Sequence, residues 1–215
     1  MPVNVALPEM SRRAELAADA VVHGIGIAAA VIGAGALIVI ASVKRNGLEL
    51  ATVTTYSFGL LAMLICSTVY NMAERSRYRE LLRRFDHAAI FVMIAGTYTP
   101  FTVLAFPEPW SSGLTIAVWT AAAAGVAFKL WRPLRWQRLS VALYLVMGWI
   151  GLVALDPFLR SLATPTLVLL LAGGVVYSAG VVFHVARHRY QNAVWHGCVL
   201  VAACTHYAAV FSLVA

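Results

Sequence analysis

Seven long apolar stretches alternate with short polar connectors along this chain. An α-helix needs about 20 mostly apolar residues to cross the hydrocarbon core of a bilayer, and each stretch meets that length. We therefore expect seven membrane-spanning helices at about 18–42, 48–71, 86–105, 112–130, 138–156, 165–186 and 192–213, with Pro157 marking the end of the fifth. Because the connectors are too short for a further domain, we predict one all-α domain over residues 1–215, a seven-transmembrane helix bundle.

The composition agrees with a membrane protein. Of 215 residues, 61% are hydrophobic and only 12% are charged, whereas a soluble domain carries roughly 25% charged residues. The net charge of +7 alone would be compatible with nucleic-acid binding. However, the basic residues lie in connectors between apolar stretches and not on one long face, so we expect no nucleic-acid partner.

The distribution of basic residues predicts the orientation of the bundle. All but three of the 16 lysines and arginines fall on one side of the seven spans, and the exceptions are Lys44, Arg45 and Arg160. Loops rich in Lys and Arg stay in the cytoplasm. We therefore expect a cytoplasmic amino terminus and a carboxyl terminus outside.

Polar residues inside the spans gather at the predicted cytoplasmic ends of four helices. Such residues are expensive in a bilayer and are functional candidates by default. Three pairs have i,i+4 spacing and so share a helix face. The candidates are Asp19 and His23, Ser67 and Asn71, Asp86, and Asn192 and His196. If the first, second, third and seventh helices are neighbours, these side chains form one polar pocket, although solvation at a helix end remains an alternative for each pair.

Four other histidines are interpreted as structural. His87 follows Asp86 but points about 100° away on a helix, which favours an interfacial position. His184 and His188 end the sixth span among arginines and are interpreted as a solvated helix end. His206 lies about 15 Å deeper than His196, and we expect it to be buried with a hydrogen-bond partner.

Several stretches together resemble the hemolysin III family, the bacterial branch of the progestin and adiponectin receptor-like (PAQR) membrane proteins. The stretches are ELAADAVVHGIGI (15–27), STVYN…RRFDHAAIFVMIAGTYTPF (67–101), YLVMGW (144–149), LAGGVVYSAGVVF (171–183) and NAVWHGCVLVAACTHYAAV (192–210). The resemblance covers nearly the whole chain. It implies seven helices with a cytoplasmic amino terminus, in the inner (plasma) membrane of a bacterium.

The resemblance also implies a zinc site near the cytoplasmic face. The family pattern has Ser-x3-His in the second helix, Asp in the third and His-x3-His in the seventh. Ser67, Asp86 and His196 match this pattern, but the other two histidine positions are Asn71 and Asn192. His196 and Asp86 would be the remaining metal ligands.

Two asparagines change the chemistry expected at those positions. A neutral amide oxygen is a poor zinc ligand and suits hard cations better. An amide both donates and accepts hydrogen bonds, so it can satisfy a buried carboxylate without a metal. We therefore expect a metal-free pocket with no cofactor, and a zinc site is the alternative.

Three functions follow from the resemblance. We favour a membrane protein that affects or senses membrane state, with the lipid bilayer and a lipid or fatty acid in the bundle as partners. The second is a zinc-dependent hydrolase of an amide-linked lipid, similar to ceramidases, in which Asp86 and Ser67 would be catalytic. The third is a cytolysin, as the family name implies. The sequence leaves the oligomeric state open.

Overall fold

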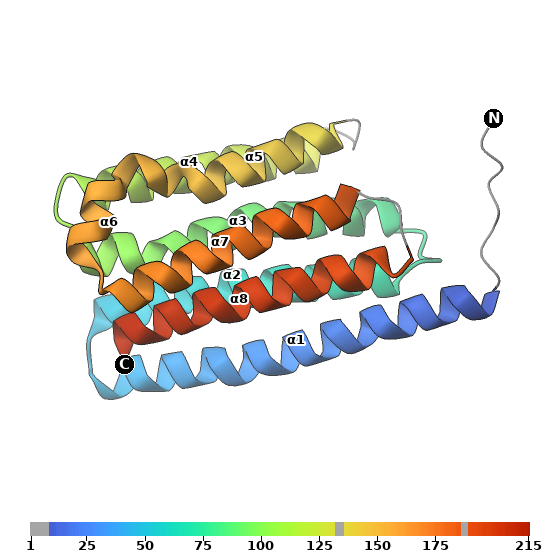
Figure 1. The fold of residues 1–215 in the computed structure, drawn as a ribbon, viewed down its shortest axis with the longest axis horizontal. Helices are drawn as coiled ribbons and strands as arrows, with labels where there is room; N and C mark the ends of the chain where they lie inside the picture. The colour runs from blue at the N-terminus through green and yellow to red at the C-terminus, as the bar shows by residue number, and fades with distance from the viewer. Residues whose placement is uncertain (1–8, 132–135, 186–188) are drawn as a thin grey trace.

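The structure is a computed structural model that describes residues 9–131, 136–185 and 189–215 (Figure 1). These residues form helices and contain no strand. The helices are α1 (Glu9–Val43), α2 (Gly47–Met72), α3 (Arg79–Ala105), α4 (Trp110–Trp131), α5 (Gln137–Trp149), the short 3-10 helix η1 (Ile150–Ala154), α6 (Leu155–Ser161), α7 (Thr164–Val185) and α8 (Gln191–Val214). Residue 186, the expected end of the sixth span, and His188 lie outside the described residues.

Seven helical stretches in the described chain are long and apolar enough to cross a membrane, which confirms the predicted fold class. The 26 residues of α2 rise about 39 Å, more than the ~30 Å hydrocarbon core requires. The fifth stretch combines α5, η1 and α6 and runs from Gln137 to Ser161. The sequence placed its end at Pro157, but this proline lies in the first turn of α6, where its missing N–H leaves no helical hydrogen bond unmade.

The helices that carry the predicted pocket are neighbours. Helix α1 packs against α2 and α8, α2 packs against α3, and α8 also contacts α2 and α3. Figure 1 shows α1, α2 and α8 running side by side, with α7 next to α8. The first, second, third and seventh spans therefore surround a common interior.

Two glycines allow α2 and α3 to approach closely. A Cβ atom on Gly59 would lie 3.2 Å from the Cα of Met93, and one on Gly96 would lie 3.3 Å from the carbonyl oxygen of Thr55. Small residues at such points let helix backbones pack tightly in lipid. This contact fixes the position of the helix ends that carry Ser67 and Asp86.

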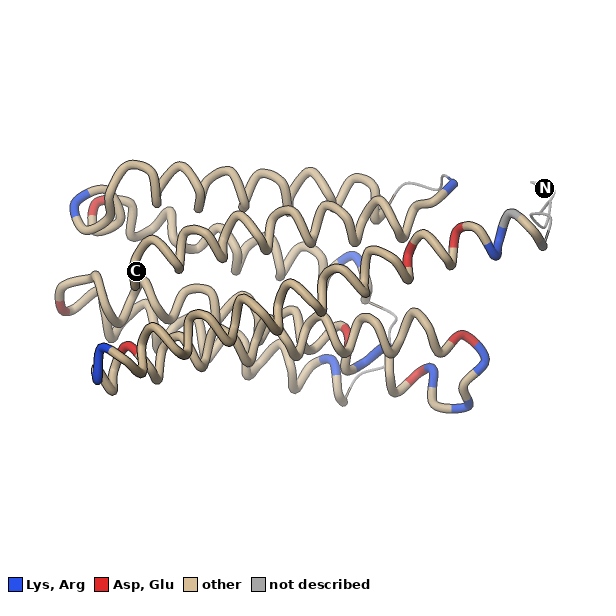
Figure 2. Tube along the Cα trace, turned by 90° about the horizontal axis from the view of Figure 1, so that it is seen from below, with Lys and Arg blue, Asp and Glu red and all other residues tan. Residues whose placement is uncertain are grey.

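The outer surface of the bundle suits a lipid environment. Large apolar side chains such as Ile32, Phe58 and Val153 are mostly exposed. Charged residues collect towards the two ends of the bundle and leave much of its length uncharged (Figure 2). In water such an apolar surface would promote association, whereas in a bilayer it is the surface that faces the acyl chains.

Candidate functional site

Four helices bring the predicted polar residues to one end of the bundle interior. Asp19 and His23 lie on α1, one turn apart and both almost fully buried. Ser67 and Asn71 are buried in the last turns of α2. His196 lies in the second turn of α8. The i,i+4 spacing explains why both members of the α1 and α2 pairs face inward.

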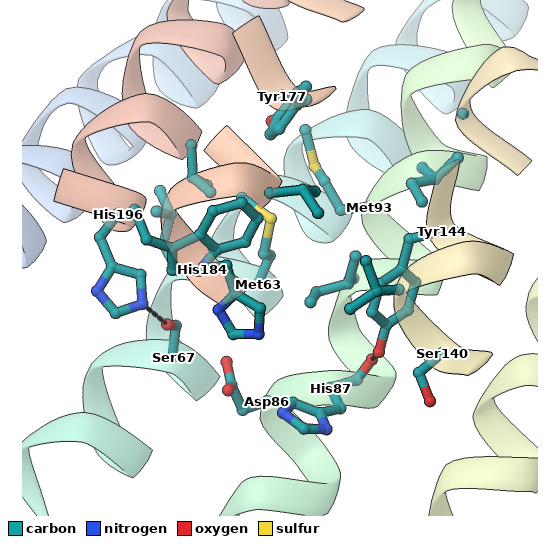
Figure 3. A pocket seen from close by; sticks show the side chains of 18 of the residues that line it. Met63, Ser67, Asp86, His87, Met93, Ser140, Tyr144, Tyr177, His184 and His196 are labelled. Atoms are coloured by element: carbon teal, nitrogen blue, oxygen red, sulfur yellow. Dashed lines mark hydrogen bonds between the residues drawn. The ribbon is translucent and has the colours of Figure 1, made fainter. Parts of the chain in front are cut away.

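His196 is the centre of this group. Its Nδ1 atom lies 2.6 Å from Oδ1 of Asp19, and its Nε2 atom lies 3.4 Å from Oγ of Ser67 (Figure 3). The side chain of Asn71 donates a hydrogen bond of 2.9 Å to the carbonyl oxygen of Ser67, and a longer one of 3.4 Å to its hydroxyl. A continuous row of polar contacts therefore runs from α2 through His196 to α1.

His23 lies next to this row of polar contacts but is not joined to it by a hydrogen bond. Its ring centroid lies 4.4 Å from that of His196. Its Nε2 atom is 3.7 Å from Oδ2 of Asp19, which is too long for a hydrogen bond, and this buried nitrogen has no hydrogen-bond partner among the described residues. A buried polar atom without a partner is uncommon. One atom each from Asp19, His23 and His196 lie within 4.8 Å of one another, a grouping that can hold a metal ion.

Asp86 and Asn192 occupy the border of the site. Both line a cavity that also contacts Ser67, Asn71 and His196. The Asp86 carboxylate points into this cavity between Ser67 and His87 (Figure 3). Asn192 lies one turn before His196 and is exposed.

The cavity has a volume of ≈ 390 Å³ and two kinds of wall. At the end near His196 the wall is polar. Further along, apolar and aromatic side chains from α2, α3, α5, α7 and α8 form the lining. They include Met63, Met93, Ile94, Leu145, Tyr177, Val181 and Leu200. Pockets of this size with a few placed polar groups are typical of small-molecule sites.

Two histidines that the sequence analysis interpreted as structural line this cavity, and a lysine close to one of them is buried. His87 lines the cavity, its Nδ1 atom lies 3.3 Å from Nζ of Lys129, and its carbonyl oxygen accepts a hydrogen bond from Tyr144. Lys129 is almost fully buried despite its place near the end of α4. His184 also lines the cavity, with its ring against Trp195. The sequence could not indicate these contacts, because they join helices that are distant in sequence.

His206 behaves as expected. Its Nε2 atom donates a hydrogen bond of 3.1 Å to the carbonyl oxygen of Leu170, across the contact between α7 and α8. Gly173 makes room for this ring, because an added Cβ would collide with it. The histidine is therefore satisfied structurally and lies at the cavity wall away from the His196 group.

The zinc ligand set implied by the family resemblance does not fit the residues present. Asn71 and Asn192 stand at two of the three expected histidine positions. The amide nitrogen of Asn71 already donates to Ser67, and Asn192 is exposed. A neutral amide is also a weak ligand for zinc.

These features define a seven-helix, multi-pass membrane protein. Its cavity has a polar wall near one end and an apolar wall along the rest. The chain belongs to the haemolysin-III-related family, whose model matches residues 15–207. It is 33% identical over 184 residues to a hemolysin-3 homolog of Bacillus subtilis (strain 168), covering 85% of this chain and 86% of that protein.

More distant relatives connect the chain to the PAQR proteins. It is 28% identical over 204 residues to the human monocyte to macrophage differentiation factor, covering 92% of this chain and 83% of that one. It is 30% identical over 179 residues to the heptahelical transmembrane protein ADIPOR2 of Oryza sativa subsp. japonica, covering 70% and 76%. No solved structure matches the chain.

Proposed function

We propose that this protein senses or affects membrane state by accepting the acyl chain of a lipid or fatty acid into its cavity. The observation that carries the proposal is the division of the cavity wall into a polar end at Asp86 and His196 and an apolar remainder. A carboxyl or amide head group would lie near the polar end. The acyl chain would lie along the apolar wall, where its burial is favourable.

This function does not require the metal ligands of the family pattern. Asn71 donates hydrogen bonds to Ser67, whose hydroxyl also lies within hydrogen-bond distance of His196. The polar end therefore has donors and acceptors for a head group without an ion at the positions of Asn71 and Asn192. We expect those two positions to remain free of metal.

Two alternative functions have weaker support. Hydrolysis of an amide-linked lipid is compatible with Asp86 and Ser67 at the polar end, where they would be the catalytic groups. Such an enzyme would release fatty acid from ceramide, whereas a sensor would bind the lipid unchanged. Cytolysis is supported only by the name hemolysin-3 of the bacterial relatives.

We further propose that the chain forms a single domain in a bacterial inner membrane, with its amino terminus in the cytoplasm. The uneven distribution of lysine and arginine supports this orientation. Reporter fusions would test it: an alkaline phosphatase fused after Ala215 should be active, and one fused in the connector between α2 and α3 should be inactive. The reverse pattern would contradict the orientation.

A pair of neighbouring valines offers a matched test of lipid binding. Val181 lines the cavity, and Val182 is 63% exposed on the outer surface. We expect the purified protein to bind a fluorescent fatty acid, Val181→Phe to weaken binding at least tenfold by filling the cavity, and Val182→Phe to leave it unchanged. Absence of binding to the unaltered protein, or equal effects of the two substitutions, would contradict the proposal.

A further inference from the structure

Asp19, His23 and His196 bring two imidazoles and one carboxylate together between α1 and α8. One possible ligand atom from each lies within 4.8 Å of the others. We propose that these three side chains bind zinc or a similar divalent transition-metal ion. The site differs from the family pattern, in which the second and seventh helices supply the ligands, and it shares His23 and His196 with the lining of the cavity.

The donor set suits zinc. Catalytic and structural zinc sites use imidazole nitrogen and carboxylate oxygen at about 2.0–2.2 Å. Tetrahedral coordination at that distance separates neighbouring ligand atoms by roughly 3.3 Å. The distance from Asp19 to His196 is 2.6 Å, and that from Asp19 to His23 is 3.7 Å. The required separation lies between these two distances, which are made by the two different oxygens of the Asp19 carboxylate.

The unpartnered nitrogen of His23 is independent evidence for a ligand. His23 is only 3% exposed, and in the part of the chain that the structure describes its Nε2 atom has no hydrogen-bond partner. Leaving such an atom unsatisfied costs about 1–3 kcal/mol. Coordination of a metal would satisfy it, and Asp19, the nearest carboxylate, would be a ligand of the same ion.

The ring nitrogen of His196 that points away from Asp19 already has a polar neighbour. A metal-bound histidine generally uses its second ring nitrogen in a hydrogen bond that fixes the orientation of the ring. The Nε2 atom of His196 lies 3.4 Å from the Ser67 hydroxyl, while Nδ1 faces Asp19. Asn71 in turn donates to Ser67. The asparagine at the family's histidine position thus supports a ligand without being one.

A second cavity adjoins the proposed site on the side of Asp19. This cavity of ≈ 250 Å³ is lined by Asp19 together with Glu15, Glu74 and Asn192. Arg12 also lines this cavity and pairs with Glu74 at 2.6 Å. Carboxylates along an approach raise the local concentration of cations. Asp19 lines this cavity and would be the first ligand that an ion in it meets.

Zinc titration of the full-length protein in detergent tests the proposal. We expect about one tightly bound zinc per chain by elemental analysis, and cobalt(II) should give the visible absorption of a tetrahedral site. Asp19→Asn and His23→Gln should each lower zinc affinity at least tenfold. His184→Gln, which alters a cavity histidine outside the group, should bind zinc like the unaltered protein.

A zinc measurement on the unaltered protein can contradict the proposal by itself, so the outcome does not depend on folding of the variants. If it binds no zinc under these conditions, the site does not exist. Zinc that persists in Asp19→Asn but disappears in Asp86→Asn would place the ion at the family position instead. Circular dichroism of each variant ensures that loss of zinc is not loss of fold.

Discussion

The carboxylate of Asp19 lies 2.6 Å from Nδ1 of His196, although 177 positions of the chain separate them. This contact joins α1 to α8, the first and last helices of the bundle. Asp19 is almost fully buried and the side chain of His196 is 11% exposed. Little solvent screens this pair. The contact therefore links the packing of α1 against α8 to the geometry of the site.

Replacing Asp19 should destabilise the protein more than breaking an exposed ion pair. Asp19→Ala leaves the Nδ1 atom of His196 without its partner, and we expect a loss of about 1–3 kcal/mol in the free energy of unfolding. Asp156→Ala is the matched control, because Asp156 pairs with Arg160 at 2.7 Å with both side chains more than 70% exposed. That pair should contribute less than about 1 kcal/mol. Equal losses in detergent unfolding would show that the buried contact adds no stability.

Restoring the family histidines should move the metal site. In a protein that carries Asp19→Asn and His23→Gln, we expect Asn71→His with Asn192→His to restore zinc binding, because His196 then has two further imidazoles near it. Elemental analysis of the purified protein measures the result. Asn71→Gln with Asn192→Gln is the control, since it changes the same positions without adding a zinc ligand. If the histidine variant stays free of zinc, these positions do not converge in this bundle.

Much of the fold follows from the sequence because apolar length determines which segments can span a bilayer. The break in the fifth span does not follow, since Ile150 to Ala154 is as apolar as an unbroken helix. The break becomes visible only where Tyr98 of α3 meets the backbone of this segment. Tertiary contacts of this kind leave no periodic signal.

The candidate site could be predicted in part, from the spacing of its polar residues. The i,i+4 spacing of Asp19 with His23, and of Ser67 with Asn71, indicated inward faces on two helices. The sequence could not show that Asp19 contacts His196, because this depends on how α1 packs against α8. It also could not show that Lys129 is buried against His87, since long side chains near helix ends usually reach water.

The close approach of α2 and α3 should be sensitive to one methyl group. Gly59→Ala would place a Cβ 3.2 Å from backbone atoms of α3, and forcing the helices apart should cost about 1–3 kcal/mol. Gly35→Ala is the matched control, because no atom of the described residues lies within 4 Å of its added Cβ. Alanine stabilises a helix by up to about 1 kcal/mol relative to glycine. Thermal unfolding in detergent should therefore shift down for Gly59→Ala and not for Gly35→Ala.

The break between α5 and η1 should depend on a single hydroxyl group. The hydroxyl of Tyr98 donates a hydrogen bond of 2.7 Å to the carbonyl oxygen of Gly148 and accepts one of 3.0 Å from the amide of Gly151. Tyr98→Phe removes both bonds where water is scarce, so we expect a loss of about 1–3 kcal/mol. Tyr78→Phe is the control, because that ring is half exposed at the end of the bundle. Detergent unfolding followed by circular dichroism compares the two, and an unchanged midpoint for Tyr98→Phe would show that the backbone at the break is stable without this side chain.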